Sequence, residues 1–239
     1  MEVNYDKLTA FRRQLHANPE VSGKEKETAA SVLKFLEACH PDEVLPNLGG
    51  LGIVATWDSG KAGPEIVFRA ELDALPIQEV NDFEYQSKRK GVSHKCGHDG
   101  NTTILCGLEQ YLSENKPIKG KVRLLFQQAE ENGEGAKSML EDKNFATIHP
   151  DYIFALHNLP GYQVGEVVVK DNTFTAAVNS IIIYLHGKTS HAAEPEHGHN
   201  PALALAQILK ESIALQNNNA EDENMRVISP VYVEMGEKA

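Results

Sequence analysis

The sequence is poor in cysteine, in aromatic residues and in long apolar runs. Its 239 residues include three Cys and one Trp. An odd, small number of cysteines in a chain of this size does not indicate a disulfide framework. No stretch approaches the roughly 18 consecutive apolar residues of a membrane-spanning helix, and the opening residues MEVNYDKLTAFRRQLH lack the apolar core of a signal peptide. These absences predict a cytoplasmic protein without a membrane partner.

Blocks of basic residues are also missing. Lys and Arg number 23 against 34 Asp and Glu, so the formal net charge is -11 at pH 7. A nucleic-acid-binding protein usually presents a basic face, and this class of partner is therefore excluded. The hydrophobic share of 41% is ordinary for a globular protein. The length suffices for one large domain, or for one domain and part of a second.

Helical and strand patterns alternate along most of the chain. The spacing of apolar residues predicts helices over Tyr5–Ala17, from Ser22 to about Cys39, over Gly100–Ser113 and over Gly135–Asp142. Ser22 and Glu25 have the spacing of a capping box at the start of the second helix. Strands are predicted over Ile53–Trp57, Ile66–Ala70, Lys121–Gln127 and Tyr152–Leu156. This alternation indicates an α/β fold, a helix-flanked mixed sheet that is largely parallel.

The pattern changes in the last third of the chain. Consecutive strands are predicted over Glu166–Val169, Phe174–Val178 and Ile181–His186, then a helix over Ala202–Leu215 and a strand over Val227–Met235. We place a boundary near Ala176, between a first domain of residues 1–175 and a smaller α+β domain of residues 176–239. A single strand–helix–strand half cannot cover its own sheet. The second domain is therefore expected to be incomplete.

Cys96 and His98 form the first cluster with metal-ligand chemistry. Gly97 stands between them, so both side chains can turn toward one ion. A thiolate and an imidazole together favour zinc or a similar metal. The alternative is a buried cysteine beside a solvent-exposed histidine.

Two further clusters stand at predicted strand ends. Glu130 and Glu131 come just after the strand Lys121–Gln127, and His157 follows the strand Tyr152–Leu156. Ligand sites of open α/β sheets gather beyond the carboxyl ends of strands, where one carboxylate can bind a metal while another transfers protons. The alternatives are a solvated acidic loop and a structural histidine. The joint occurrence of the three clusters predicts one metal-dependent hydrolase site.

Six segments, in the same order along the chain, resemble the amidohydrolase branch of the aminoacylase/carboxypeptidase-type metallopeptidases. That branch includes hippurate hydrolases, indole-acetyl-amino-acid hydrolases and N-acetyl-diaminopimelate deacetylases. The segments are FRRQLHANPEVSGKEKETA near the start, RAELDALPI at Arg69–Ile77, CGHDGNTT at Cys96–Thr103, FQQAEENGEGAKSML at Phe126–Leu140, ALHNLPGYQVG at Ala155–Gly165 and GKTSHAAEPEHGHNP at Gly187–Pro201.

The resemblance implies a zinc-aminopeptidase-like catalytic domain and assigns roles within it. Cys96, His98, Glu131 and His157 match the metal ligands of the family, and Glu130 matches its general base. The cofactor implied is a divalent metal, one or two ions of Zn, Mn, Co or Ni.

The resemblance also implies roles outside this set. Asp73 matches a carboxylate that supports the site, and His191 matches a histidine of the smaller domain that reaches a substrate site, usually in a partner subunit. By spacing alone the histidine-rich loop around His191 is typical of a surface loop. The smaller domain of the family is a dimerisation or lid domain, so a homodimer is expected. Family members run further than this chain, and the C-terminal part with one more His ligand is expected to be absent.

The expected reaction is the hydrolysis of the amide bond of N-acyl amino acids, giving a carboxylic acid and a free amino acid. Two alternatives stay open: a dipeptidase or carboxypeptidase that acts on short peptides with the same scaffold, and an inactive metal-binding fragment. Asn101 stands where the family commonly has His, so we expect different hydrogen bonding around the ligands. Departures in the loop after His191 leave the substrate preference open.

Overall fold

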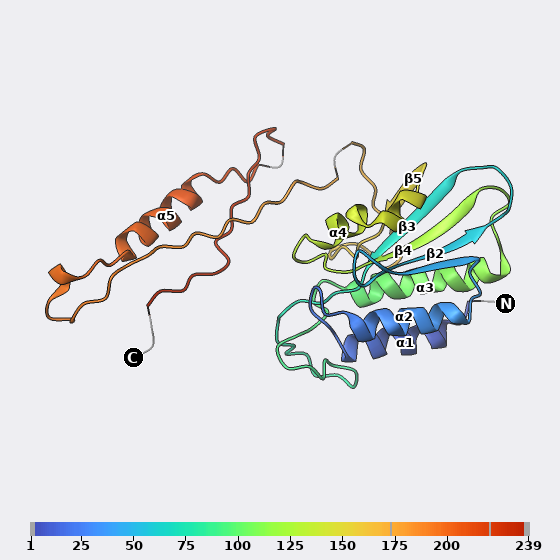
Figure 1. Cartoon of the computed structure of the whole chain (residues 1–239), viewed down its shortest axis with the longest axis horizontal. Helices are drawn as coiled ribbons and strands as arrows, with labels where there is room; N and C mark the ends of the chain where they lie inside the picture. The colour runs from blue at the N-terminus through green and yellow to red at the C-terminus, as the bar shows by residue number, and fades with distance from the viewer. Residues whose placement is uncertain (1–2, 173, 220, 237–239) are drawn as a thin grey trace. The chain divides into compact units, whose positions relative to one another are not determined.

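The structure is a computed structural model that describes residues 3–172, 174–219 and 221–236 (Figure 1). The chain divides into two compact units, unit 1 (Met1–Glu166) and unit 2 (Val167–Ala239). This division precedes the domain boundary that we expected near Ala176. The predicted site residues other than His191 all belong to unit 1.

Unit 1 is a five-stranded sheet flanked by helices. Its helices are α1 (Tyr5–Ala17), α2 (Lys26–Glu37), α3 (His98–Glu114), α4 (Gly135–Glu141) and the short 3-10 helix η1 (Lys143–Thr147). Its strands are β1 (Glu43–Leu48), β2 (Gly52–Asp58), β3 (Glu65–Glu71), β4 (Lys121–Gln127) and β5 (Tyr152–Ala155). The order across the sheet is β1-β2-β4-β3-β5. Strand β2 is antiparallel to both of its neighbours, whereas β3 is parallel to β4 and β5. Four strands thus share one direction, which confirms the mixed, largely parallel sheet.

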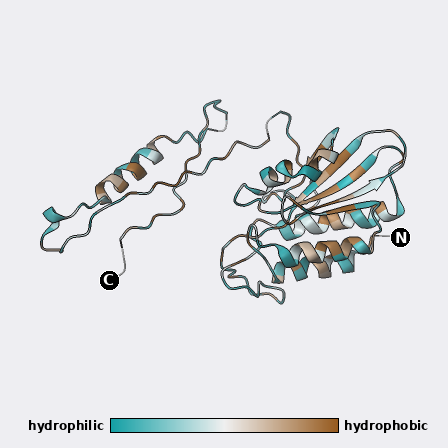
Figure 2. Cartoon of the chain, in the orientation of Figure 1, coloured by the Kyte–Doolittle hydropathy of each residue, from teal (hydrophilic) through white to brown (hydrophobic). Residues whose placement is uncertain are grey.

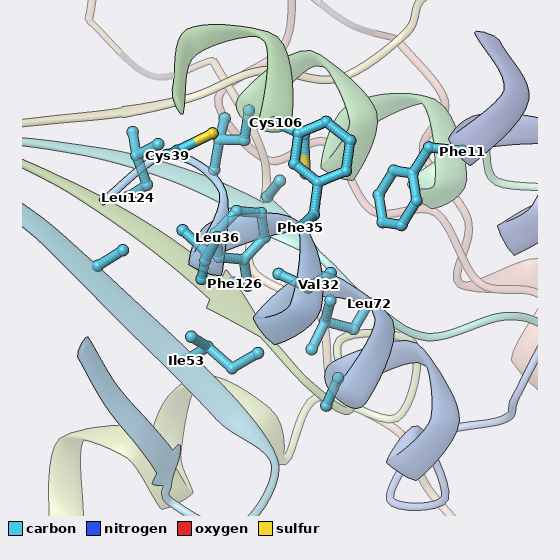
Figure 3. Close-up of a cluster of buried hydrophobic side chains, with 14 of the residues drawn as sticks. Phe11, Val32, Phe35, Leu36, Cys39, Ile53, Leu72, Cys106, Leu124 and Phe126 are labelled. Carbon is cyan, nitrogen blue, oxygen red and sulfur yellow. The ribbon is translucent and has the colours of Figure 1, made fainter. Parts of the chain in front are cut away.

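Apolar side chains alternate between the two faces of the sheet and build a core on each. Ile53 and Trp57 of β2 join the larger core with α1, α2 and α3, and Val54 between them joins the smaller one beneath α4 and η1. Figure 3 shows the larger core, where Phe35 of α2 lies among residues of the sheet and α3. Hydrophobic residues accordingly appear both in the strands and on the helices of unit 1 (Figure 2). Burial on both faces makes this sheet a rigid support for the loops at its ends.

The strand ends bring the predicted clusters to one edge of the sheet. The chain reaches Asp73 just after β3, Glu130 just after β4 and His157 just after β5. These three strands are parallel, so their carboxyl ends lie at the same edge. The irregular stretch from Asp73 to Gly97 then delivers Cys96 and the start of α3 to that edge.

Strand β1 was not predicted from the sequence. Its residues EVLPNL have no regular alternation and include Pro46, which cannot donate a hydrogen bond. Because β1 is the first strand of the sheet order, it is an edge strand, where proline is tolerated.

Unit 2 contains helix α5 (Ala202–Ala214) and the 3-10 turn η2 (Pro195–His197). The strands predicted over Glu166–Val169, Phe174–Val178, Ile181–His186 and Val227–Met235 do not form in the part of unit 2 that the structure describes. That prediction was wrong for this chain because a strand needs a hydrogen-bonded neighbour. The described residues of unit 2 have only the isolated bridges Lys188–His199 and Asn217–Arg226. Among all described residues, no helix is long and apolar enough to cross a membrane.

Candidate metal centre

Cys96, His98 and His157 lie together at the sheet edge. Their ligand atoms all lie within 4.8 Å of one another, and the Cys96 Sγ is 3.3 Å from the His157 Nε2. Gly97 makes this approach possible, because its φ of +97° is a left-handed conformation that side chains disfavour. A Cβ at Gly97 would lie 2.4 Å from the Asn158 Oδ1. The predicted pairing of Cys96 with His98 around a glycine turn therefore has a geometric basis.

His98 also faces the glutamate pair that follows β4. Its Nε2 is 3.8 Å from the Glu130 Oε2 and 3.7 Å from the Glu131 Oε1. The Glu131 side chain is 16% exposed and that of Glu130 is 38% exposed. His98 thus belongs to both groups of potential ligands. The two distances are nearly equal, so the separate roles predicted for the glutamates rest on the sequence.

Asp73 supports this centre from behind. Its main-chain oxygen is 3.0 Å from the His98 Nδ1, and its Oδ1 is 3.3 Å from the same nitrogen. Its Oδ2 accepts from the Glu131 amide at 3.0 Å and from the Ser22 hydroxyl at 2.7 Å. These contacts orient His98 so that its Nε2 faces the glutamates, which is the usual arrangement behind a histidine ligand.

Buried polar atoms without a hydrogen-bond partner test whether a cation fits. Among the described residues they include the His98 Nε2 and the Glu131 Oε1. A buried polar atom that lacks a hydrogen bond is costly unless something else satisfies it. These two atoms face each other across the centre. With the Cys96 thiol and the His157 imidazole, they make a donor set that a borderline divalent metal suits.

The electrostatics of the centre point the same way. Burial, followed by the hydrogen bond and charge of Glu131, raises the pKa of the Cys96 thiol to about 12. Burial also raises the pKa of Glu130. Burial opposes the charging of His98, but the hydrogen bond to Asp73 and the nearby carboxylates raise its pKa overall. Negative charge therefore predominates, and a cation would relieve it.

A further carboxylate, Glu71 at the end of β3, lies behind the centre. Its side chain forms an ion pair with Arg69 and accepts a hydrogen bond at 3.0 Å from the Asn101 amide. Both Glu71 and Asn101 are 1% exposed. Asn101 thus makes the hydrogen bond of a supporting residue beside the centre. The change expected relative to a His at this position stays a prediction.

His191 lies in unit 2, where its ring is exposed. Its Nδ1 accepts a hydrogen bond of 3.1 Å from the Ala193 amide. The role predicted for His191 at the substrate stays a prediction.

Two residues of the site were missed because their pattern has a commoner interpretation. The prediction of a capping box at Ser22 and Glu25 was wrong. Helix α2 begins after Glu25, and the Glu25 side chain makes no capping hydrogen bond. Glu20 instead accepts hydrogen bonds from the amide and hydroxyl of Thr28 in the first turn. Ser22 donates to Asp73, and Glu25 accepts from the Ala129 amide at 2.8 Å.

The model of peptidase family M20/M25/M40 matches residues 67–227. The chain belongs to this family. The match includes Asp73, Cys96, the glutamate pair and His157, so it covers the centre described above.

Curated relatives of this family member include N-acetyl-L-cysteine deacetylase of Bacillus subtilis, which is 40% identical over 210 residues, 87% of this chain and 49% of the relative. Hippurate hydrolase of Campylobacter jejuni is 34% identical over 219 residues, 92% of this chain and 57% of the relative. The chain thus spans about half of the length of these curated relatives.

Solved structures similar to this family member include a dinuclear metal-binding peptidase from Bacillus subtilis. It is 36% identical with a TM-score of 0.61, over 66% of this chain and 44% of that one. A candidate aminohydrolase from methicillin-resistant Staphylococcus aureus is 31% identical with a TM-score of 0.68, over 88% of this chain and 56% of that one. These likenesses agree with the sheet and helices of unit 1.

Proposed function

We propose that this family member hydrolyses the amide bond of N-acyl amino acids and releases a carboxylic acid and a free amino acid. The observation that carries the proposal is the convergence of Cys96, His157, Glu130 and Glu131 around His98, with buried ligand atoms that lack a hydrogen-bond partner in the described chain. The names of the relatives, a deacetylase of N-acetyl-L-cysteine and a hippurate hydrolase, support this class of substrate.

The proposed cofactor is one or two divalent ions, of Zn, Mn, Co or Ni. Cys96, His98, Glu131 and His157 would hold them, as the mixture of sulfur, nitrogen and oxygen donors suits such metals. A bound divalent ion would polarise the scissile carbonyl and lower the pKa of water. The description of the Bacillus subtilis peptidase as dinuclear supports two ions.

Glu130 is the general base in this proposal. It is the more exposed member of the glutamate pair, so substrate and water can reach its carboxylate. Burial raises its pKa toward the range in which a carboxylate accepts a proton readily. Glu130 would take the proton of the attacking water and then deliver it to the leaving amine.

His191 is the proposed donor to the carbonyl oxygen, in a homodimer where unit 2 of one copy serves its partner. Its Nδ1 accepts a hydrogen bond from the Ala193 amide, so a neutral ring carries its proton on Nε2. That N–H can stabilise negative charge that develops on the substrate oxygen.

Replacing Glu130 by Gln tests the proposal most directly. Hydrolysis of acetyl- and benzoyl-amino acids would be measured with added Mn²⁺, Co²⁺ or Zn²⁺, together with the metal content of the protein. We expect Glu130→Gln to lower turnover by about 10²–10⁴-fold, because the general base is lost, and to keep the metal content. The matched control is Glu134→Gln in the same loop, where Glu134 is exposed and accepts from Asn132. This control should keep full turnover.

Three results would contradict the proposal in distinct ways. Normal turnover of Glu130→Gln would remove the role of Glu130. Faster hydrolysis of free dipeptides than of acyl amino acids would favour a dipeptidase. Bound metal without turnover in the unaltered chain would favour a metal-binding fragment.

A further inference from the structure

Ala129 has an unusual backbone conformation immediately before the glutamate pair. Its φ is +49°, in the left-handed region that non-glycine residues disfavour. Strand β4 ends two residues earlier, and the chain reverses here so that Glu130 and Glu131 face His98. The direction of both carboxylates therefore depends on the conformation of this one residue.

The reversal is closed on one side by the loop itself. The Ala129 carbonyl accepts from the Gly135 amide at 2.8 Å, and the Glu130 carbonyl accepts from the Gly133 amide at 2.8 Å. The Ala129 amide takes no part in these bonds. Its partner is the Glu25 Oε1 at 2.8 Å, from a residue 104 positions earlier in the chain.

The burial of Glu25 carries a free-energy cost that an ordinary structural contact does not require. It is fully buried, and its Oε2 has no hydrogen-bond partner among the described residues. Burial of a carboxyl is costly unless its contacts compensate. Three residues earlier, Ser22 donates to the Asp73 carboxylate that also holds the Glu131 amide. One short segment ahead of α2 thus holds the glutamate loop at both Ala129 and Glu131.

We propose that Glu25 is a positioning residue for the metal centre: its carboxylate holds the Ala129 amide and so directs Glu130 and Glu131 toward His98. This inference rests on the proposed function, because Glu131 is a metal ligand in it. Glu25 itself does not contact substrate or metal. Its effect passes through the backbone of Ala129.

The test is a Co²⁺ titration of the full chain, followed by the visible absorption of the bound ion, which reports ligand geometry. Glu25→Met keeps the length of the side chain but loses the acceptor. We expect it to weaken Co²⁺ binding by about 10–100-fold and to change the spectrum, as loss of a supporting contact typically does. Glu25→Gln keeps an acceptor oxygen. Its Co²⁺ affinity should lie within about threefold of that of the unaltered chain, and the visible spectrum of the bound ion should be unchanged.

Glu109→Met is the matched control for burial. Glu109 on α3 is also fully buried, but it lies beside Cys106 rather than the glutamate loop. It should keep the Co²⁺ affinity and spectrum. Thermal unfolding of each variant separates stability from metal binding. If Glu25→Met does not fold, Glu25→Asp, whose shorter side chain draws the acceptor away from Ala129, should weaken binding severalfold.

Several outcomes would overturn the inference. These are unaltered Co²⁺ binding by Glu25→Met or, where that variant does not fold, by Glu25→Asp; a Gln variant as weak as the Met variant; and an equal loss in Glu109→Met. Failure of the unaltered chain to bind Co²⁺ would overturn the proposed metal centre as well, whereas normal binding by both it and Glu25→Met would overturn only the role of Glu25.

Discussion

Gly97 is the residue on which the approach of Cys96 to His98 depends. It combines a left-handed φ with a close contact, since a Cβ would lie 2.4 Å from the Asn158 Oδ1. Asn158 also provides the carbonyl that faces the His157 Nδ1, at 2.9 Å. A side chain at position 97 would therefore disturb two proposed ligands at once.

We predict that Gly97→Ala weakens Co²⁺ binding by at least about tenfold, because Asn158 and then His157 must shift. It should also lower the free energy of unfolding by more than the roughly 1–2 kcal/mol of left-handed strain. Gly91→Ala is the matched control, since Gly91 has a φ of +75° but open space around its Cβ position. Urea unfolding and a Co²⁺ titration of both variants check this. Equal effects of the two substitutions would show that strain alone matters.

Helix α1, the long loop after β3 and helix α3 meet at His16. Its Nδ1 is 2.7 Å from the Asp99 Oδ2, and its Nε2 is 3.3 Å from the Glu79 Oε1. Arg12 also pairs with Asp99, Lys95 pairs with Glu79, and the His94 ring lies 6.3 Å from that of His16. The hydrogen bond to Asp99 is the largest influence on His16 and, against the effect of burial, its pKa is raised above the ordinary value.

We predict that His16→Gln costs more stability in acid than in base. A histidine with a raised pKa in the folded state stabilises the protein fully below its unfolded pKa of about 6.5, and this contribution disappears as the pH rises through the folded value. The loss should approach about 1.5–3 kcal/mol at about pH 6 and be smaller at about pH 9. Urea unfolding at both pH values measures it, with the exposed His149→Gln as control. A pH-independent loss would contradict the assignment.

Elements with a strong local signal were predictable, and those that depend on distant partners were not. Helix α1 and strand β4 have the predicted bounds, because helical spacing and a buried apolar run leave few alternatives. Strand β1 depends on pairing with β2 rather than on its own residues. The strands predicted in unit 2 have suitable residues but no neighbouring strand in the described chain.

The same limit applies to the metal centre. Cys96, His98, Glu131 and His157 carry chemistry in their side chains, so they could be proposed as ligands from the sequence: Cys96 and His98 by their spacing around Gly97, Glu131 and His157 by their places after strands. Glu25 acts on a backbone amide 104 residues away. No local pattern encodes such a contact, and its spacing from Ser22 resembles a common helix cap.

At the scale of the whole molecule, the proposed chemistry is divided between two units. The four proposed ligands and Glu130 belong to unit 1, and the proposed oxyanion donor His191 belongs to unit 2. Metal binding and turnover should therefore respond differently when the units are separated.

We predict that a fragment of residues 1–166 binds Co²⁺ within about threefold of the full chain, because unit 1 holds every proposed ligand present. Turnover of acyl amino acids by the fragment should fall by about 10²–10³-fold, the usual effect of losing one oxyanion donor. Metal titration and an activity assay, with circular dichroism to establish folding, check both. Full turnover by the folded fragment would contradict a role for unit 2.

Strand β5, which leads to His157, has a consequence beyond catalysis. It is the last strand of the sheet order, and Tyr152, Ile153 and Phe154 are each more than half exposed. An apolar edge strand is a template onto which the extended segment of another molecule can pair. The net charge of -11 opposes such encounters by mutual repulsion. Aggregation should therefore depend on ionic strength: salt that screens the repulsion favours association through the strand that leads to a proposed metal ligand.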